Sequence, residues 1–140
     1  QKCPELWSEE FISLLTERLS VEGRLITYST AASIRASFKR AGLKIYSIVP
    51  SINDKQKWSS GTVAMKKELS QRLISKNCQI KDLSTREVEH LNTRSSIPYR
   101  DPTGKGNSQE IISKRELEQS KSQLINTSSW RKKWNTAQWQ

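Results

Sequence analysis

The chain has 140 residues, of which 34% are hydrophobic and 27% charged, and 24 Lys and Arg against 14 Asp and Glu give a net charge of +10. This length accommodates one domain, and an apolar fraction below the usual ~45–50% indicates a modest core with solvated or partner-facing segments. The charge favours a polyanionic partner such as nucleic acid, or an anionic membrane surface. No apolar run approaches the ~18–20 residues that span a bilayer, and no signal-peptide pattern opens the chain. We therefore expect a cytoplasmic protein without a membrane partner.

Metal chemistry is not expected. The sequence holds two cysteines, Cys3 and Cys78, and one histidine, His90, whereas a structural zinc site needs about four nitrogen or sulfur ligands. A disulfide framework is equally disfavoured, so two idle thiols in a reducing compartment are the expectation.

Composition divides the chain after residue 67. Residues 1–65 carry 9 basic and 6 acidic side chains, whereas residues 66–140 carry 15 and 8 and are therefore more basic. We expect residues 1–67 to form an α/β part and residues 68–140 a basic helical extension.

The first part alternates predicted helices and strands. A helix opened by Pro4 has one apolar face, formed by Leu6, Trp7, Phe11, Leu14, Leu15 and Leu19. Predicted next are a strand at 24–29, a helix at 30–41 ended by Gly42, a strand at 43–49, a loop at 51–60 and a strand at 61–66.

Strand, helix and strand at this spacing predict a βαβ unit. The loop of about ten residues is too short for a second helical crossover, so the third strand is expected to run antiparallel to the second. Such a small sheet lacks partners on its outer edge and second face. Either the second half of the chain or a region preceding Gln1 would supply them.

The second part is predicted to hold helices and ordered loops. Ser84 and Glu87 form a capping-box pattern for a helix reaching about Thr93, and the two-proline segment 95–102 must be extended or turned. A helix at 108–125 and a short helix capped by Ser128 complete the predicted elements.

The carboxyl end of the first strand is the most plausible ligand edge. Ligands of open α/β sheets bind outside the carboxyl ends of strands, and the start of the 30–41 helix favours anions. Tyr28 and Ser29 lie at this end, although an ordinary strand-to-helix turn explains them equally.

The last helix is the candidate nucleic-acid surface. Trp130 and Trp134 share one helix face beside Arg131, Lys132 and Lys133. Aromatic rings stack on unpaired bases while basic groups hold phosphates. The same tryptophans could instead anchor the helix onto its own domain, or contact a membrane.

Two further clusters have simpler explanations. Glu87, Glu89 and His90 could perform acid–base chemistry, but ion pairing with Arg86 and Arg94 explains them at lower cost. The loop at 104–106 matches no phosphate-binding pattern and is expected to be a linker.

Several segments together resemble one family. Lys2-Cys3-Pro4-Glu5-Leu6-Trp7-Ser8, the segment from Gly23 to Ser29, and the helix and turn from Ser33 to Leu43 are similar in order and spacing to the methyltransferase domain of tRNA 5-methylaminomethyl-2-thiouridine biosynthesis enzymes, of the stand-alone, cyanobacterial type. The resemblance covers about residues 2–49, with 61–65 as the last strand.

The resemblance implies a Rossmann-like sheet of which this chain would be the C-terminal portion, ending in an antiparallel strand. It implies S-adenosylmethionine as cofactor and a tRNA wobble uridine bearing an aminomethyl group as substrate. The glycine-rich cofactor site would lie in the missing N-terminal half of the same domain. The family's basic loop after its sixth strand is replaced here by residues 50–57.

The resemblance also assigns substrate-binding roles but no catalytic residue. Pro4 and Trp7 would line the cleft near the transferred methyl group, and Thr27, Tyr28 and Ser29 would form the sheet edge beside the substrate. Arg35 would contact phosphate or pair with an acid of the missing half. The rival hypotheses are a non-catalytic basic RNA-binding module and an interaction domain with solvated charge.

Overall fold

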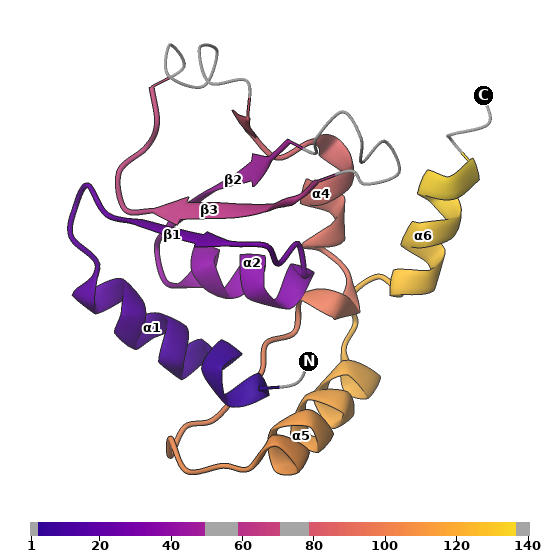
Figure 1. Ribbon diagram of the computed structural model, residues 1–140. Helices are drawn as coiled ribbons and strands as arrows, with labels where there is room; N and C mark the ends of the chain where they lie inside the picture. Colours follow the sequence, from indigo (N-terminus) through magenta and orange to yellow (C-terminus); the bar gives the residue numbers. More distant parts are fainter. Residues whose placement is uncertain (1–2, 50–58, 71–78, 137–140) are drawn as a thin grey trace.

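The computed structural model describes residues 3–49, 59–70 and 79–136 (Figure 1). Most of the predicted 51–60 loop and Cys78 lie outside these residues. In chain order the elements are η1 (Pro4–Trp7), α1 (Glu9–Arg18), β1 (Arg24–Thr27), α2 (Ala32–Arg40), β2 (Lys44–Ile48), β3 (Gly61–Met65), β4 (Ile80–Lys81), α4 (Thr85–His90), η2 (Arg94–Ser96), α5 (Ser108–Lys121) and α6 (Thr127–Thr136). Within these ranges, no helix is long and apolar enough to cross a bilayer.

The sheet has the strand order β1-β3-β2-β4. β3 pairs antiparallel with both β1 and β2, so β1 and β2 run parallel to each other on either side of it. The predicted antiparallel third strand is therefore confirmed. Thr62 of β3 lies between Thr27 of β1 and Ser47 of β2, which brings three hydroxyl side chains onto one row.

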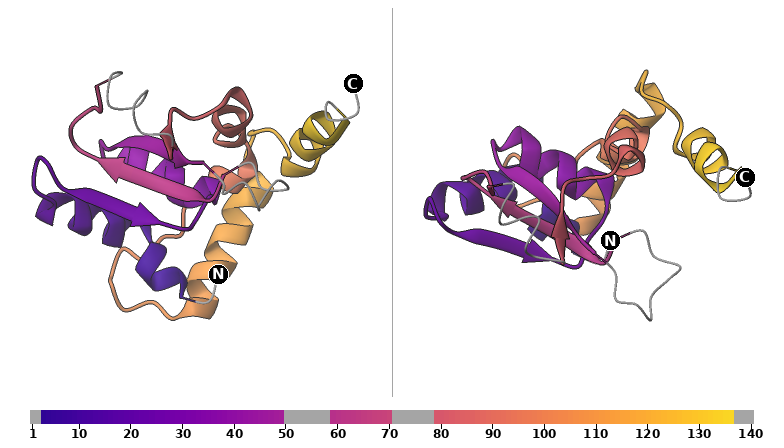
Figure 2. Two further views of the ribbon diagram at one scale, coloured as in Figure 1. Left: turned by 45° about the horizontal axis from the view of Figure 1, so that its top comes forward. Right: turned by 90° about the horizontal axis from the view of Figure 1, so that it is seen from above.

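Helices α1 and α2 cover one face of the sheet (Figures 1 and 2). The core on this face contains Ile12, Ile34, Phe38, Leu43, Ile45 and Ala64. A second cluster of Tyr46, Val63 and Met65 lies on the opposite face, where Leu69 and Ile80 pack against it. β3 is buried along its whole length because it is the central strand between two apolar layers.

The first helix differs from the prediction. A 3-10 turn from Pro4 to Trp7 ends at Ser8, whose hydroxyl then caps α1 by accepting the Phe11 N–H at 3.2 Å. This break changes which residues face the core: Ile12 is 1% exposed, whereas Leu14 is 57% exposed. The predicted apolar face is wrong in this respect, because it assumed one uninterrupted helix.

Contacts cross the compositional boundary after residue 67. β4 pairs with Ser47 and Ile48, extending the sheet by a strand that the sequence did not reveal. The two-proline segment is extended, and the carbonyl of Tyr99 accepts the N–H of Glu9 at 2.9 Å. η2 packs against α2, and α5 packs against η1.

The predicted capping box is confirmed, because Ser84 and Glu87 each hydrogen-bond the other's backbone N–H. The helix itself ends at His90, and α5 ends at Lys121 because Ser122 takes an extended conformation. α6 then lies at the periphery of the molecule beside α4 (Figure 2).

Candidate functional site at the carboxyl end of β1

The candidate ligand edge begins at the last residue of β1. We call Thr27, Tyr28 and Ser29 the β1 edge. Tyr28 is 94% exposed, while Thr27 and Ser29 are half-buried. The Ser29 N–H donates to Thr27 Oγ1 at 3.1 Å, and the Ala31 N–H donates to Ser29 Oγ at 3.3 Å. The turn into α2 is therefore held by its own hydroxyl groups and presents the phenol of Tyr28 to solvent.

Thr62 connects the β1 edge to the buried side of the sheet. Its hydroxyl donates to the carbonyl of Ser29 at 2.8 Å and accepts from Arg35 Nε at 2.7 Å. Thr62 is fully buried, so these two bonds satisfy a hydroxyl that water does not reach. The position of Ser29 thus depends on the guanidinium of Arg35.

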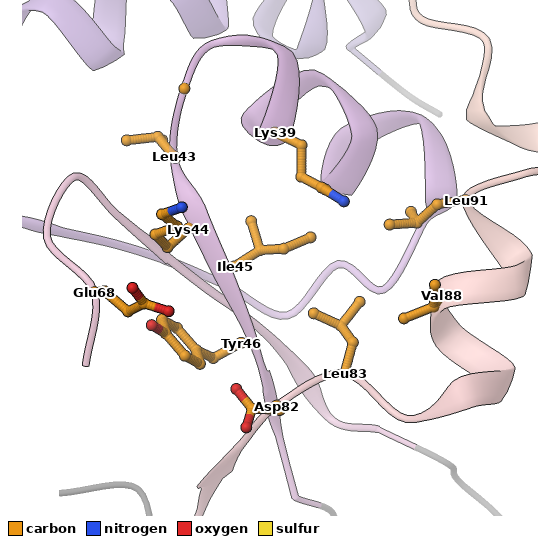
Figure 3. Close-up of a pocket in the computed structure, with 11 residues that line it drawn as sticks. Lys39, Leu43, Lys44, Ile45, Tyr46, Glu68, Asp82, Leu83, Val88 and Leu91 are labelled. Carbon is orange, nitrogen blue, oxygen red and sulfur yellow. The ribbon is translucent and has the colours of Figure 1, made fainter. Parts of the chain in front are cut away.

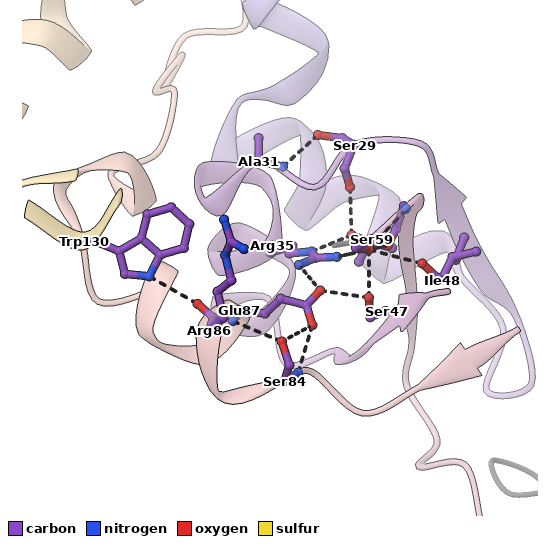
Figure 4. Close-up of polar contacts among 12 residues, drawn as sticks. Ser29, Ala31, Arg35, Ser47, Ile48, Ser59, Ser84, Arg86, Glu87 and Trp130 are labelled. Atoms are coloured by element: carbon purple, nitrogen blue, oxygen red, sulfur yellow. Dashed lines mark hydrogen bonds and ion pairs between the residues drawn. The ribbon is translucent and has the colours of Figure 1, made fainter. Parts of the chain in front are cut away.

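Arg35 lies in the interior, which corrects its predicted place at a phosphate. Its side chain is 1% exposed, and Nη1 lies 2.8 Å from Glu87 Oε1. Its Nη2 donates to Ser59 Oγ and to the carbonyl of Gly61, each at 3.0 Å (Figure 4). The acid that pairs with Arg35 therefore belongs to this chain, and the guanidinium is held too deeply to meet a substrate.

Glu87 supplies the negative charge of this network. Its Oε1 accepts the hydroxyl of Ser47 at 2.8 Å, and its Oε2 accepts both the hydroxyl and the N–H of Ser84 at 2.8 Å. Burial raises the pKa of this carboxyl, but the bonds from Ser84 and Ser47 and the charge of Arg35 outweigh burial and lower it below 4.5. Glu87 is ionised at neutral pH and is a structural anion.

From the sequence, Glu87 is expected to cap a helix and to pair with Arg86 or Arg94, with acid–base chemistry as the alternative. The expected pairing is wrong, because Glu87 turns inward to Arg35. Ser47, Ser59 and Thr62 were also missed as members of the network, and no local pattern marks them. The one available signal is the row of hydroxyl residues at the ends of three strands.

Pro4 and Trp7 come from η1. Pro4 is buried, and Trp7 is half-buried against the core on the α1 and α2 side of the sheet. Among the described residues, no hydrogen bond joins η1 to the β1 edge. The residues predicted for one cleft are thus presented by two separate elements.

The tryptophans of α6 point toward α4. Trp130 is 7% exposed, its ring stacks on His90 at a centroid distance of 4.2 Å, and Nε1 donates to the carbonyl of Arg86 at 3.3 Å. Trp134 Nε1 donates to Glu89 at 2.9 Å, and Lys133 pairs with the same carboxylate. The geometry thus matches the docking alternative for Trp130, whereas Arg131 and Lys132 are exposed.

His90 is neutral at physiological pH. Burial, together with the positive charges of Arg35, Arg131 and Arg86, lowers the pKa of its imidazole to about 4. A neutral ring stacks on Trp130 without the cost of burying a charge. The neutral imidazole of His90 therefore helps to dock α6 onto α4.

The residues present do not form a glycine-rich cradle for S-adenosylmethionine. Gly104 and Gly106 follow no strand, and the N–H of Gly106 is already donated to Asp101 Oδ1 at 3.0 Å. Gly61 packs against the carbonyl of Thr27, and Gly23 against Leu19. In the described part of the chain, no group of His, Cys, Asp and Glu side chains could hold a metal ion.

Two pockets of the described residues lie apart from the β1 edge. One, of about 410 Å³, lies at the amino end of β2, with Leu83, Val88 and Leu91 on one side and Lys44 and Glu68 on the other (Figure 3). The second, of about 380 Å³, lies between α4 and α6. Ligands of open α/β sheets bind at the carboxyl ends of strands, so the first pocket is at the wrong end of β2 for such a site.

Residues 1–66 match the family model described as S-adenosyl-L-methionine-dependent methyltransferase. The crystal structure of MnmC2 from Aquifex aeolicus is similar with a TM-score of 0.70 and 27% sequence identity, covering 86% of this chain and 35% of that chain. The present chain thus spans well under half the length of that protein. Among curated proteins, no sequence matches the chain. The α/β sheet with its inserted antiparallel strand is that of a Rossmann-like methyltransferase, and the chain resembles the S-adenosylmethionine-dependent methyltransferases of tRNA modification.

Proposed function

We propose that this chain is the C-terminal, substrate-facing part of an S-adenosylmethionine-dependent methyltransferase that acts on the aminomethyl group of a modified tRNA wobble uridine. The observation that carries the proposal is the family match of residues 1–66, which includes the β1 edge, at the carboxyl end of β1. In this proposal residues 1–67 belong to the catalytic domain, and residues 68–140 form an extension that packs against this domain. The protein would act in the cytoplasm.

The chain's own residues would bind and orient the substrate. Methyl transfer to an amine requires a neutral amine held in line with the methyl donor, so placement supplies most of the rate. Tyr28 offers an exposed ring and phenol, and the hydroxyls of Thr27 and Ser29 fix the turn that carries it. Pro4 and Trp7 would close the other side of the cleft.

Support also comes from how firmly the β1 edge is held. The chain of bonds from Ser29 through Thr62 and Arg35 to Glu87 ties this turn to α4. Pre-organised substrate contacts lose less conformational entropy on binding. A rigid turn with one exposed aromatic residue suits the positioning of a flat nucleobase.

The test is methyl transfer from labelled S-adenosylmethionine to tRNA with a 5-aminomethyl wobble uridine, using the polypeptide extended upstream of Gln1. Transfer should occur to this tRNA and not to the same tRNA with unmodified uridine. Calorimetry should detect S-adenosylmethionine binding by the extended polypeptide and little binding by this chain. Absence of binding by both would reject the enzyme and leave the RNA-binding module as the alternative.

Tyr28→Ala provides the residue-level arm of the test. Because the ring is 94% exposed, its removal should leave thermal stability unchanged. Loss of one stacking contact worth ~1–3 kcal/mol should lower transfer by about five-fold or more. Ile26→Ala, at a 68% exposed position on β1 two residues before Tyr28, is the matched control and should transfer normally. Equal activity of both variants would remove Tyr28 from the site.

A further inference from the structure

The pocket between α4 and α6 has the features of a nucleotide site. We call it the α4–α6 groove; it is lined by Glu89, Asn92, Ile125, Ser129, Trp130 and Lys133. Its volume of about 380 Å³ lies within the ~300–1,000 Å³ range of small-molecule sites. An apolar wall and a polar rim are the combination that a nucleobase requires, since its faces are apolar and its edge is polar.

The apolar wall is preformed. Trp130 is fixed between the stack on His90 and the hydrogen bond to the carbonyl of Arg86. Ile125 is 58% exposed although its backbone is firmly held, because its carbonyl accepts the Arg94 N–H at 2.9 Å. An exposed isoleucine on a rigid segment offers a surface for a flat ring at little ordering cost.

The rim carries hydrogen-bonding groups and a balanced charge. Asn92, in the turn that follows α4, and Ser129, on α6, provide an amide and a hydroxyl. Glu89 is the single acid that lines the groove, and Lys133 neutralises it at 2.7 Å. The groove is therefore polar at its mouth without repelling an anion.

The surroundings of the groove are basic. α6 holds Arg131, Lys132 and Lys133 and no acidic residue, and Arg131 and Lys132 are exposed. On a helix Lys132 lies three residues beyond Ser129 and so borders the groove. Cationic side chains beside a base-sized pocket match the chemistry of a nucleotide unit, with its phosphate next to its base.

The groove and the β1 edge lie on the same side of the molecule. β1 and β2 both point toward the side where α4 and α6 stand (Figure 1). α4 is joined to β2 through the bond from Ser47 to Glu87, and to α2 through the bond from Arg35 to Glu87. A large RNA approaching the β1 edge would therefore meet α6.

We propose that the α4–α6 groove binds an unpaired nucleotide of the substrate RNA, with the base in the groove and neighbouring phosphates on Arg131 and Lys132. The proposal rests on the proposed function only in the identity of the RNA. It differs from base stacking by Trp130 itself, because that ring already stacks on His90.

The test measures, by fluorescence anisotropy at several salt concentrations, how the full chain binds labelled tRNA, single-stranded RNA and duplex RNA of equal length. Arg131→Gln with Lys132→Gln should reduce the salt slope for single-stranded RNA by about 1.4, since each phosphate contact contributes ~0.7. Lys105→Gln with Lys114→Gln removes the same charge elsewhere and should change the slope far less.

The groove itself is tested without a change of charge. The double variant Ile125→Ala with Asn92→Ala should weaken the binding of single-stranded RNA and leave the binding of duplex RNA unchanged. The control Leu14→Ala, at an equally exposed site on α1, should change the binding of neither RNA. His90 is the sole histidine and lies beneath the groove against Trp130, so its imidazole resonances should shift on adding uridine monophosphate but not inorganic phosphate.

Each outcome decides the proposal. Unchanged binding by the Ile125 and Asn92 variant, or equal binding of duplex RNA, overturns the nucleotide site. Binding to phosphatidylglycerol vesicles in place of RNA would identify a membrane surface instead. None of these binding experiments uses S-adenosylmethionine, so they test the groove separately from the proposed function. RNA binding in the groove without methyl transfer would reject the proposed function and keep the nucleotide site. Methyl transfer without RNA binding in the groove would reject the nucleotide site and keep the proposed function.

Discussion

Arg35 and Glu87 form a buried ion pair of 2.8 Å across 52 positions of sequence, with side chains 1% and 3% exposed. The pair joins α2 to α4 and supports the β1 edge through Thr62. Buried ion pairs of this kind contribute little net stability. Removing one partner, however, leaves the other charge buried without compensation and costs ~3–5 kcal/mol. Typical unfolding free energies are only ~5–15 kcal/mol.

Glu87→Ala is therefore expected to lower the free energy of unfolding by about 3–5 kcal/mol in urea denaturation. Glu116→Gln, on the exposed side of α5, is the control and should stay within ~0.5 kcal/mol of the parent. In a double-mutant cycle with Arg35→Met, the two losses should be non-additive by about 1–3 kcal/mol. Additive losses would show that the pair does not act as a unit.

Thr62→Val keeps the shape of the side chain and removes its hydroxyl. The carbonyl of Ser29 and Arg35 Nε would each lose a buried partner, so we expect a loss of ~1–3 kcal/mol. Hydrogen exchange should show faster exchange of the Ala31 amide, which belongs to the same turn. Thr16→Val removes a buried hydroxyl that bonds only within α1, and it should leave exchange at Ala31 unchanged.

The single histidine makes a pH prediction simple to check. The pKa of His90 is about 4 in the folded protein against 6.5 for an unperturbed imidazole. Below pH 6.5 the imidazole of the unfolded chain is protonated, whereas that of the folded protein stays neutral until about pH 4. The free energy of unfolding therefore falls as the pH falls from 6.5 to 4. The slope stays below ~1.4 kcal/mol per pH unit, because a single histidine binds at most one proton more in the unfolded chain than in the folded protein.

Proton NMR of the imidazole should give a midpoint near 4, and His90→Phe should flatten the stability profile between pH 6.5 and 4. A midpoint near 6.5 would mean that α6 does not cover His90 in solution.

Ser8→Ala removes the hydroxyl that separates η1 from α1. The hydroxyl accepts the Phe11 N–H and donates to the carbonyl of Glu5 at 2.9 Å, so we expect a loss of about 1 kcal/mol, measured by thermal unfolding. Ser8→Thr retains both bonds and should recover most of the loss. A stabilising Ser8→Ala would indicate that a continuous helix is preferred.

Local signals predicted much of the fold. Gly42 has a positive φ of 87° and follows α2 as expected, and the capping box of Ser84 and Glu87 begins α4 where the pattern placed it. The antiparallel third strand followed from loop length alone. β4 was missed because two residues are too few for a recognisable strand pattern.

The site was harder to predict because its interactions are non-local. The spacing of Leu14 and Leu15 fits a helix face, but periodicity does not reveal that a serine cap rotates that face away from the core. Likewise, Arg35 reads as a surface charge in a helix. Only the tertiary structure shows that Arg35 is buried because it pairs with Glu87, 52 residues later in the sequence.

The central position of β3 also dictates the order in which the protein can assemble during synthesis. β1 and β2 leave the ribosome first but have no direct partner in each other, so the sheet must await residue 61 and beyond. At ~5–20 residues per second, Glu87 emerges about one to five seconds after β3, and until then Arg35 has no counter-charge. The nascent chain thus passes through an interval in which its guanidinium must stay hydrated, and only α4 allows the interior to close.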